Sequence, residues 1–195
     1  MKSDSSALLS GLKAIKDVYY EGNASGPGET EKLYLKVRAT EGRIYSDEEA
    51  LSLPYLKNHP HAHEWKLRAR SSQRLLEYFR GVKNFNFLDL GCGNGWFART
   101  LASATECAGI GLDLNQQELE QAARLSGNLD LFYLNGDIFT LKLPSGMFSH
   151  IIIGAAIQYF PDLKVLLDRL IEVLARDGEI HIFDSPFYTG DAIQE

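Results

Sequence analysis

Three glycines at alternate positions lie in a short loop that follows an apolar segment. The loop reads Asp89-Leu-Gly91-Cys-Gly93-Asn-Gly95. Glycines in such a turn let a ligand approach the backbone closely and direct free amide groups at its anionic part. Dinucleotide-binding loops usually space these glycines as G-x-G-x-x-G, whereas this loop has G-x-G-x-G after an acidic residue. The loop therefore indicates a nucleotide-type ligand with a spacing that departs from the dinucleotide pattern.

Two further acidic residues close two later apolar segments. Asp113 lies near the end of the second segment and Asp137 follows the third. A carboxylate at the end of the second strand accepts hydrogen bonds from the ribose hydroxyls in nucleotide-binding sheets, and NAD enzymes share this position. Asp113 therefore indicates a nucleoside without selecting the cofactor. Asp137 has a second interpretation as a loop or helix-cap residue.

The order of apolar segments predicts the sheet that positions these residues. From about residue 82 onward, short apolar segments alternate with helical patterns, which is typical of a parallel sheet with crossover helices. We predict an α/β fold, a Rossmann-like, doubly wound, mostly parallel sheet with helices on both faces and an N-terminal helical lid segment. The expected strands are 85–90, 108–114, 129–134, 148–157 and 179–184.

Two helices have recognisable boundaries in the sequence. Asn115 and Glu118 have the spacing of a capping box, which opens a helix after the second strand. A long amphipathic helix follows Asp162 and has apolar residues on one side up to Leu174. We expect it to end at Gly178, where glycine would act as a C-cap.

The first eighty residues follow a different pattern. We predict an N-terminal helical and irregular segment over 1–80 and a ligand-binding core over 81–195. Within the first segment the pattern predicts an amphipathic helix, a turn-rich segment, an irregular stretch and a second helix. These cover 8–20, 22–28, 43–63 and 65–80, respectively.

The glycine loop, Asp113 and Asp137 together resemble the class I methyltransferases that depend on S-adenosylmethionine (SAM). The resemblance covers residues 82–184 and includes a fourth motif over 148–162, where a strand, small residues and an aromatic precede a Pro-Asp helix start. It implies SAM as the cofactor. The residues that it assigns to SAM binding are Asp89, Gly91, Cys92, Gly93, Gly95, Asp113, Leu114, Asp137, Ile138, Gly154 and Ala155.

The resemblance also implies individual roles. Asp137 would accept a hydrogen bond from the adenine amino group, Ile138 would pack on the adenine ring, and Gly154 and Ala155 would line the methionine side. The fourth motif departs from the family pattern, with Ser149 where an Asp is common and Gln158 where a His often stands. No catalytic base is therefore assigned. In-line methyl transfer depends chiefly on alignment and exclusion of water.

We expect an unidentified small molecule as the methyl acceptor, with residues 43–80 closing as a lid. The sequence lacks a target-recognition domain and an Asn-Pro-Pro-Tyr-like signature, and its net charge of -6 disfavours nucleic acid. No apolar stretch reaches the ~20 residues of a membrane span and the start lacks a signal-peptide pattern, so we expect a cytoplasmic protein. Because the resembled family continues past its fifth strand, we expect the core to be incomplete at its C-terminus.

Weaker candidates have structural interpretations beside the functional ones. His59, His61 and His63 alternate as metal ligands on an extended segment do, but Pro60 favours a solvated loop, and we expect no metal. Cys92 is interpreted as a small filler of the loop. Five further residues either contact the ligand or acceptor, or have solvated, packing or capping roles: Tyr45, Arg70, Tyr159, Asp184 and Tyr188.

Two other functions stay open. A non-catalytic SAM- or nucleotide-binding module would keep the glycines and both aspartates, and Ser149 and Gln158 favour it. An NAD-dependent oxidoreductase would share Asp113, but the glycine spacing disfavours it.

Overall fold

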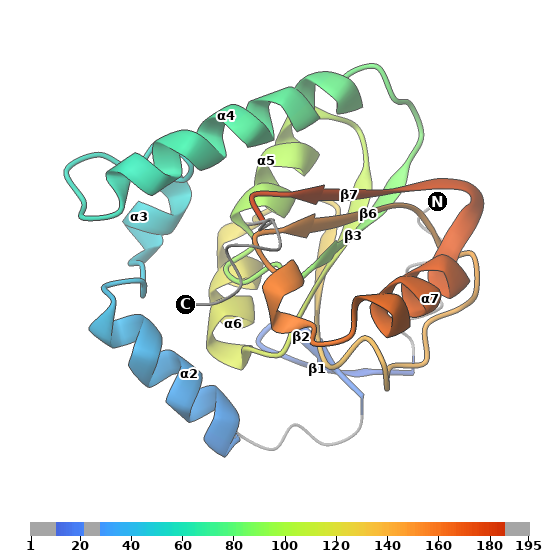
Figure 1. Cartoon of the computed structure of the whole chain (residues 1–195), viewed down its shortest axis with the longest axis horizontal. Coiled ribbons are helices and arrows are strands. Elements are labelled where there is room, and N and C mark those ends of the chain that lie inside the picture. The colour runs from blue at the N-terminus through green and yellow to red at the C-terminus, as the bar shows by residue number, and fades with distance from the viewer. Residues whose placement is uncertain (1–10, 22–27, 186–195) are drawn as a thin grey trace, which may run out of the picture.

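The computed structural model describes residues 11–21 and 28–185, and a seven-stranded sheet organises them (Figure 1). The strand order is β1-β2-β5-β4-β3-β6-β7. Only the β1–β2 pair is antiparallel among the described pairs, so the predicted α/β fold with a mostly parallel sheet is confirmed. The strands are β1 (Lys13–Ile15), β2 (Val18–Tyr20), β3 (Asn86–Leu90), β4 (Ala108–Asp113), β5 (Leu131–Asn135), β6 (Phe148–Gly154) and β7 (Leu174–Phe183).

Helices cover both faces of the sheet, as a doubly wound fold requires. One buried cluster joins α4, α5 and α6 to side chains such as Phe87, and a second joins α7 to side chains such as Leu88. Phe87 and Leu88 are neighbours in β3, and successive side chains of a strand point to opposite faces, so β3 contributes to both cores. The helices are α2 (Glu29–Thr40), α3 (Asp47–Ser52), α4 (Ala62–Phe79), α5 (Trp96–Ala104), α6 (Gln116–Leu125) and α7 (Leu163–Val173), with a 3₁₀ turn η1 (Ile157–Tyr159).

The strand order reverses at β3, which pairs with β4 on one side and β6 on the other. The chain crosses to opposite faces after these strands, so their loops separate and leave a crevice at the carboxyl ends. The glycine loop after β3 lies at this crevice. No helix of the described residues is long and apolar enough to cross a membrane.

The predicted helix over 8–20 is wrong for the described part of that range. Residues 13–20 form the β1–β2 hairpin, whose turn residues Lys16 and Asp17 have φ of 51° and 60°, as a tight hairpin turn requires. β2 pairs in parallel with β5 and buries Val18 and Tyr20, which alternate as strand residues do. This pairing covers the edge of β5, and it makes part of the N-terminal segment a component of the core sheet.

The helix after Asp162 is shorter than predicted. α7 ends at Val173, and Leu174 is extended and pairs with Phe148 at the start of β7. Gly178 does not cap the helix. A Cβ on Gly178 would lie 2.8 Å from the Leu174 side chain and from the Ser149 carbonyl oxygen, so glycine permits the close approach of β7 to β6.

The remaining N-terminal elements are fixed to the core to different degrees. α4 confirms the predicted second helix, and its buried Trp65 packs edge-on against Trp96 of α5 with ring centroids 5.2 Å apart. α3 lies inside the stretch predicted to be irregular and opens with a capping box of Ser46 and Glu49. α2, which the sequence did not predict, has no buried side chain among those described. α3 and α4 are therefore anchored, whereas α2 rests on the surface.

We expect Gly95→Ala to destabilise the fold much more than Gly127→Ala. Both glycines have positive φ, 67° and 55°, so alanine costs about 1 kcal/mol at each. A Cβ on Gly95 would lie 2.6 Å from Tyr133 Oη and 2.9 Å from Ala122 Cβ, whereas nothing lies within 4 Å at Gly127. Overpacking adds about 1–3 kcal/mol at Gly95. Urea unfolding measures both, and equal losses would show that the loop relaxes freely.

Candidate cofactor site

The glycine loop lies against the loop that follows β6. Gly91, Gly93 and Gly95 all have positive φ, of 72°, 51° and 67°. A Cβ on Gly91 would lie 2.6 Å from the Cβ of Ala156, so the two loops meet at van der Waals contact only because Gly91 lacks a side chain. The alternate glycines therefore serve both the turn and the packing of the crevice wall.

The backbone amides of the loop are largely used inside the protein. Gly91 N–H and Cys92 N–H donate to the Leu112 carbonyl at 2.8 and 3.3 Å, and Gly95 N–H donates to the Cys92 carbonyl at 2.9 Å. Gly93 N–H donates to Asp113 Oδ2 at 2.8 Å. The expectation that free amides face an anionic ligand is therefore wrong for these four residues. A loop without these donors does not form a cradle for a pyrophosphate.

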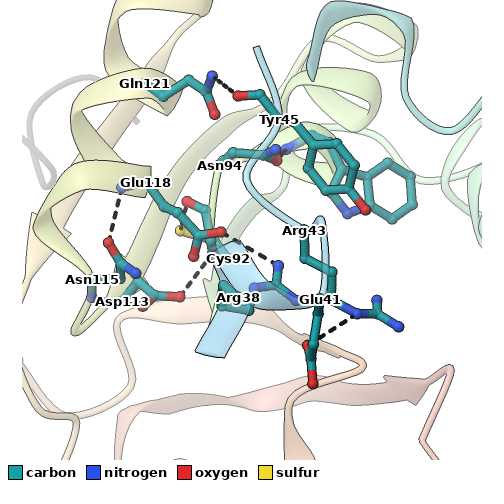
Figure 2. Close-up of polar contacts among 12 residues, drawn as sticks. Arg38, Glu41, Arg43, Tyr45, Cys92, Asn94, Asp113, Asn115, Glu118 and Gln121 are labelled. Carbon is teal, nitrogen blue, oxygen red and sulfur yellow. Dashed lines mark hydrogen bonds and ion pairs between the residues drawn. The ribbon is translucent and has the colours of Figure 1, made fainter. Parts of the chain in front are cut away.

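Asp113 joins the glycine loop to the start of α6 (Figure 2). Its Oδ2 accepts from Gly93 N–H and its Oδ1 accepts from Asn115 N–H, both at 2.8 Å. Burial raises the pKa of this carboxyl, and the backbone donors act against the rise. A carboxylate oxygen accepts more than one hydrogen bond, so both oxygens keep capacity for a ligand hydroxyl.

Only half of the predicted capping box forms at α6. The Asn115 side chain accepts from Glu118 N–H at 3.0 Å, which confirms the helix start. The Glu118 carboxylate does not return to Asn115 N–H, because Asp113 already accepts that donor. Glu118 Oε1 instead lies 3.5 Å from Nη2 of Arg38, which α2 contributes (Figure 2).

Asp89, Asp113 and Glu118 form an acidic cluster around the glycine loop. Asp89 is only 3% exposed, and burial followed by the charge of Asp113 raises its pKa to about 7. The same two causes raise the pKa of Glu118 to about 7, with Arg38 opposing them. Excess negative charge in a poorly solvated crevice favours a cationic ligand and repels a polyanion.

α2 crosses the carboxyl edge of the sheet. Figure 1 shows it on the side toward which the arrowheads of β6 and β7 point. Tyr34 packs edge-on against Tyr159 with centroids 6.4 Å apart, Glu31 accepts from Gln116 N–H at 2.6 Å, and Arg38 reaches Glu118. The Nε atom of Arg38 is buried without a hydrogen-bond partner in the described part of the chain. α2 thus spans the crevice from η1 to α6.

A cavity of about 130 Å³ remains between α2, the segment that precedes α3, the glycine loop and α6. Arg38, Tyr45, Asn94, Glu118 and Gln121 are among the residues that line it. Sequence motifs did not indicate Arg38, Tyr34 or the position of the Glu118 side chain at the cavity. The sequence signal at Glu118, its spacing from Asn115, indicates only a helix cap.

The residues that the resemblance assigns to SAM after β4 and β5 differ in exposure. Leu114 is 66% exposed after β4, whereas Ile138 is 2% exposed and packs in the core. Ile138 therefore offers no ring-packing surface in this conformation, and the next residue, Phe139, is 42% exposed. Asp137 Oδ1 accepts from Phe139 N–H at 3.0 Å, as the loop interpretation expects, and its second oxygen has no recorded donor among the described residues.

The fourth motif contains more packing than chemistry. A Cβ on Gly154 would lie 2.7 Å from the Phe183 ring, and Ala155 has a positive φ of 52°. Ser149 Oγ donates to the Asn86 carbonyl at 2.7 Å and ties β6 to β3. Gln158 Nε2 donates to the Ala155 carbonyl at 2.8 Å. Ser149 therefore has a structural role, and its departure from the family pattern is no evidence about catalysis.

The structure separates the weaker candidates. Tyr45 is buried and accepts from Trp65 Nε1 at 2.9 Å, so its ring belongs to the packing of α3 and α4. Tyr159 is 62% exposed beside Tyr34, and Asp184 accepts from Ser71. Arg70 is exposed, which agrees with a solvated helix face. Tyr188 lies outside the described residues.

Four side chains with potential metal or nucleophile chemistry have structural surroundings. His61 Nε2 lies 2.6 Å from the Glu41 carbonyl oxygen, and His59, His61 and His63 do not converge as metal ligands in the described chain. Burial raises the pKa of the Cys92 thiol, which keeps it protonated, so Cys92 fills space in the loop.

We expect Asp89→Asn to raise the free energy of unfolding at pH 8. Folding raises the Asp89 pKa from 3.8 to about 7, so the folded state retains a proton that the unfolded state loses, and stability falls as pH rises through this window. Asparagine removes that penalty, and we expect a gain of about 1–4 kcal/mol at pH 8 and a smaller gain at pH 5. Urea unfolding at both pH values measures it.

Asp137→Asn is the matched control, because Asp137 is partly exposed and is expected to change stability little at either pH. An Asp89→Asn protein no more stable than the wild type at pH 8 would contradict the buried-charge interpretation.

Comparison with known proteins identifies the arrangement. Residues 87–178 match the family described as "Methyltransferase domain". The chain is 26% identical over 117 residues to the sterol 24-C-methyltransferase of Aspergillus fumigatus, which covers 57% of this chain and 31% of that protein. It is also similar to the crystal structure of a SAM-dependent methyltransferase from Mesorhizobium loti, with 26% identity, a TM-score of 0.51 and coverage of 57% of this chain and 52% of that chain.

A putative SAM-dependent methyltransferase from Methanococcus maripaludis shares the fold over 86% of this chain and 67% of its own, with a TM-score of 0.55 and 16% identity. The chain spans less than half the length of the first curated relatives, 31% of one and 48% of the next. The family match covers the glycine loop, Asp113, Asp137 and the fourth strand of the predicted core. Residues 87–178 are therefore similar to a methyltransferase domain, and the comparisons support the fold of a class I SAM-dependent methyltransferase.

Proposed function

We propose that this chain binds SAM at the carboxyl edge of β3, β4 and β5 and transfers its methyl group to a small molecule. The carrying observation is the acidic cluster of Asp89, Asp113 and Glu118 beside a loop with few free amides. SAM has a sulfonium and an ammonium against one carboxylate and contains no phosphate. A dinucleotide would instead bring its negative pyrophosphate to this cluster, which is electrostatically unfavourable.

The residues present fit SAM in their chemistry. We assign the ribose hydroxyls to Asp113, the adenine amino group to the open oxygen of Asp137, and the cationic end of the ligand to Asp89 and Glu118. Leu114 and Phe139 supply exposed apolar surface for the adenine ring. The remaining predicted contacts, with the glycines, Cys92, Gly154 and Ala155, are backbone and packing contacts along the same crevice.

Bound SAM would supply an electrophilic methyl group, and the protein would align the acceptor and exclude water. Gln158 is bonded to the Ala155 carbonyl and Ser149 to Asn86, so neither is placed as a general base. We therefore assign no catalytic base. As in the sequence analysis, we propose a small molecule as the methyl acceptor.

We further propose that the lid is α2 rather than the whole of 43–80. α2 contacts Tyr159 through Tyr34 and Glu118 through Arg38, and the cavity left beside Glu118 is about 130 Å³, smaller than the roughly 300–1,000 Å³ of typical ligand pockets. In this proposal α2 therefore moves when a nucleoside ligand enters. α3 and α4 cannot follow easily, since Arg99 Nη2 donates to the Ala50 carbonyl at 2.9 Å and Trp65 packs on Trp96. In this proposal residues 81–195 form the SAM-binding core, completed by the β1–β2 hairpin.

We expect calorimetry to detect binding of SAM and S-adenosylhomocysteine but not of NAD. Asp113→Ala is expected to weaken SAM binding by about 1.5–3 kcal/mol, because it removes hydrogen bonds to a charged acceptor. Asp168→Ala, on the exposed side of α7, is the control and should bind normally. NAD binding with no response to either SAM compound would refute the proposal.

A second assay separates catalysis from simple binding. A screen of metabolite extracts for S-adenosylhomocysteine release is expected to show turnover that depends on Asp113. Binding without turnover in any extract would favour the non-catalytic module.

We expect S-adenosylhomocysteine to slow hydrogen exchange of the α2 amides more than those of α4. Without ligand, α2 should exchange faster than α6, because its described side chains include no buried one. Arg38→Gln should speed exchange of α2 in the free protein by removing the ion pair with Glu118. If S-adenosylhomocysteine leaves the exchange rate of the α2 amides unchanged, α2 is not the lid.

A further inference from the structure

A second cluster of polar side chains lies on β6 and β7, away from the acidic cluster. His150 pairs in register with Glu179, and Ile152 pairs with His181, so the three polar side chains share one face of the sheet. His150 precedes Gly154, the last residue of β6, by four positions, which corresponds to about 13 Å along the strand. The cluster therefore lies apart from the crevice proposed for SAM.

Three atoms of this cluster converge. His150 Nδ1 lies 3.3 Å from His181 Nε2, and His181 Nε2 lies 3.3 Å from Glu179 Oε2. His150 Nδ1 lies 3.9 Å from the same carboxylate oxygen. In a tetrahedral zinc site with bonds of about 2.0–2.1 Å, neighbouring ligand atoms lie about 3.3–3.4 Å apart. Two edges of the triangle already have this length, and the third needs only a small shift of the half-exposed Glu179.

We propose that His150, Glu179 and His181 bind a divalent zinc-like ion, with its fourth position open to water. Two imidazoles and one carboxylate form a common donor set for zinc, and imidazole favours zinc over magnesium or calcium. The group is the one set of potential metal ligands that converges in the described chain. His59, His61 and His63, whose alternate spacing is also that of metal ligands on an extended segment, do not converge in the described chain.

The surroundings hold the ligand side chains in place. Phe79 and Phe85 pack edge-on against His150 with ring centroids 5.0 and 5.3 Å apart. Tyr78 Oη donates to Glu179 Oε2 at 2.5 Å, so α4 orients the carboxylate from outside the cluster. Such outer hydrogen bonds fix the direction of metal ligands and are worth about 10–100-fold in affinity.

Both imidazoles are suited to ligation. Burial lowers the pKa of His150 and of His181, which favours the neutral imidazole, and the neutral ring is the form that binds a metal. Without a metal, one ring must donate to the other across the 3.3 Å contact. With a metal, both facing nitrogens act as donors of electron pairs to the ion, and each ring keeps its proton on the other nitrogen.

The ion would act on the fold rather than on methyl transfer. β7 pairs only with β6 in the described sheet, so a site with ligands on both strands would fasten this edge strand. Anything that binds only the folded state raises stability in proportion to the logarithm of its concentration. The inference does not depend on the proposed function.

Zinc titration of the full chain, without an affinity tag and after chelator treatment, tests the proposal. We expect calorimetry to show one Zn²⁺ per chain and the unfolding midpoint to rise with Zn²⁺. Co²⁺ in place of Zn²⁺ should give the visible absorption of a four-coordinate ion. His181→Gln and the conservative Glu179→Gln are each expected to weaken Zn²⁺ binding at least about 10-fold, and Tyr78→Phe about 10-fold.

His63→Ala is the matched control, because His63 is exposed in the histidine-rich segment before the body of α4. It should leave Zn²⁺ binding unchanged. Absence of Zn²⁺ binding, equal binding by the wild type and Glu179→Gln, or loss of binding in His63→Ala would each overturn the proposal. The unfolding midpoint without Zn²⁺ confirms that each variant is folded.

Discussion

The carboxylate of Asp113 connects the elements on which the crevice depends. It accepts from Gly93 N–H in the loop after β3 and from Asn115 N–H at the start of α6, so two segments from neighbouring strands are fixed by one side chain. Because Asp113 occupies Asn115 N–H, Glu118 is released from its capping role and faces Arg38. The charge of the crevice, its cover by α2 and the geometry of the glycine loop all follow from that arrangement.

This arrangement holds negative charge where water is scarce. Burial and mutual repulsion raise the pKa of Asp89 and of Glu118, which costs folding free energy at neutral pH. Structural needs do not explain a buried Asp89, since no hydrogen bond of its carboxylate is recorded in the described chain beyond the influence of Ala98 N–H. A cationic ligand offsets the repulsion. The same charges oppose a pyrophosphate, so electrostatics and the amide bonding of the loop favour the same ligand class.

The sheet has two regions with different tasks. At the carboxyl edge, α2 rests on the surface through Tyr34, Glu31 and Arg38, which suits an element that must open. On the β6–β7 side, the rings of Phe79 in α4 and of Phe85 just before β3 pack against His150, and Phe79 also packs against His181. Here aromatic rings and the Tyr78–Glu179 hydrogen bond hold the polar side chains in place, which suits a fixed structural site. α4 contacts both regions of the molecule: its Trp65 packs in the cluster with Tyr45 and Ala50, and its Phe79 packs against His150.

The sequence by itself determined the sheet and the positions of the acidic residues. Apolar segments, glycine spacing and the Asn115 cap are local signals, because each depends on neighbouring residues, and the strands β3 to β6 lie within a few residues of their predicted bounds. The sequence pattern did not indicate the helix α2. It wrongly predicted a helix where the hairpin at 13–20 lies and a helix longer than α7, which ends at Val173. Each depends on a partner strand or surface that is distant in the sequence.

Only the tertiary structure decided which charged groups meet. The contact of Arg38 with Glu118 spans 80 residues, and that of His150 with His181 spans 31. The local pattern around these residues does not indicate their partners, because it predicts only that a polar side chain is solvent-exposed or caps a helix. The sequence did not indicate that the loop amides are occupied, since the acceptors of Gly91, Cys92 and Gly93 N–H lie on β4. Local periodicity specifies the helices and strands, whereas the arrangement of the strands in the sheet specifies which side chains form the site.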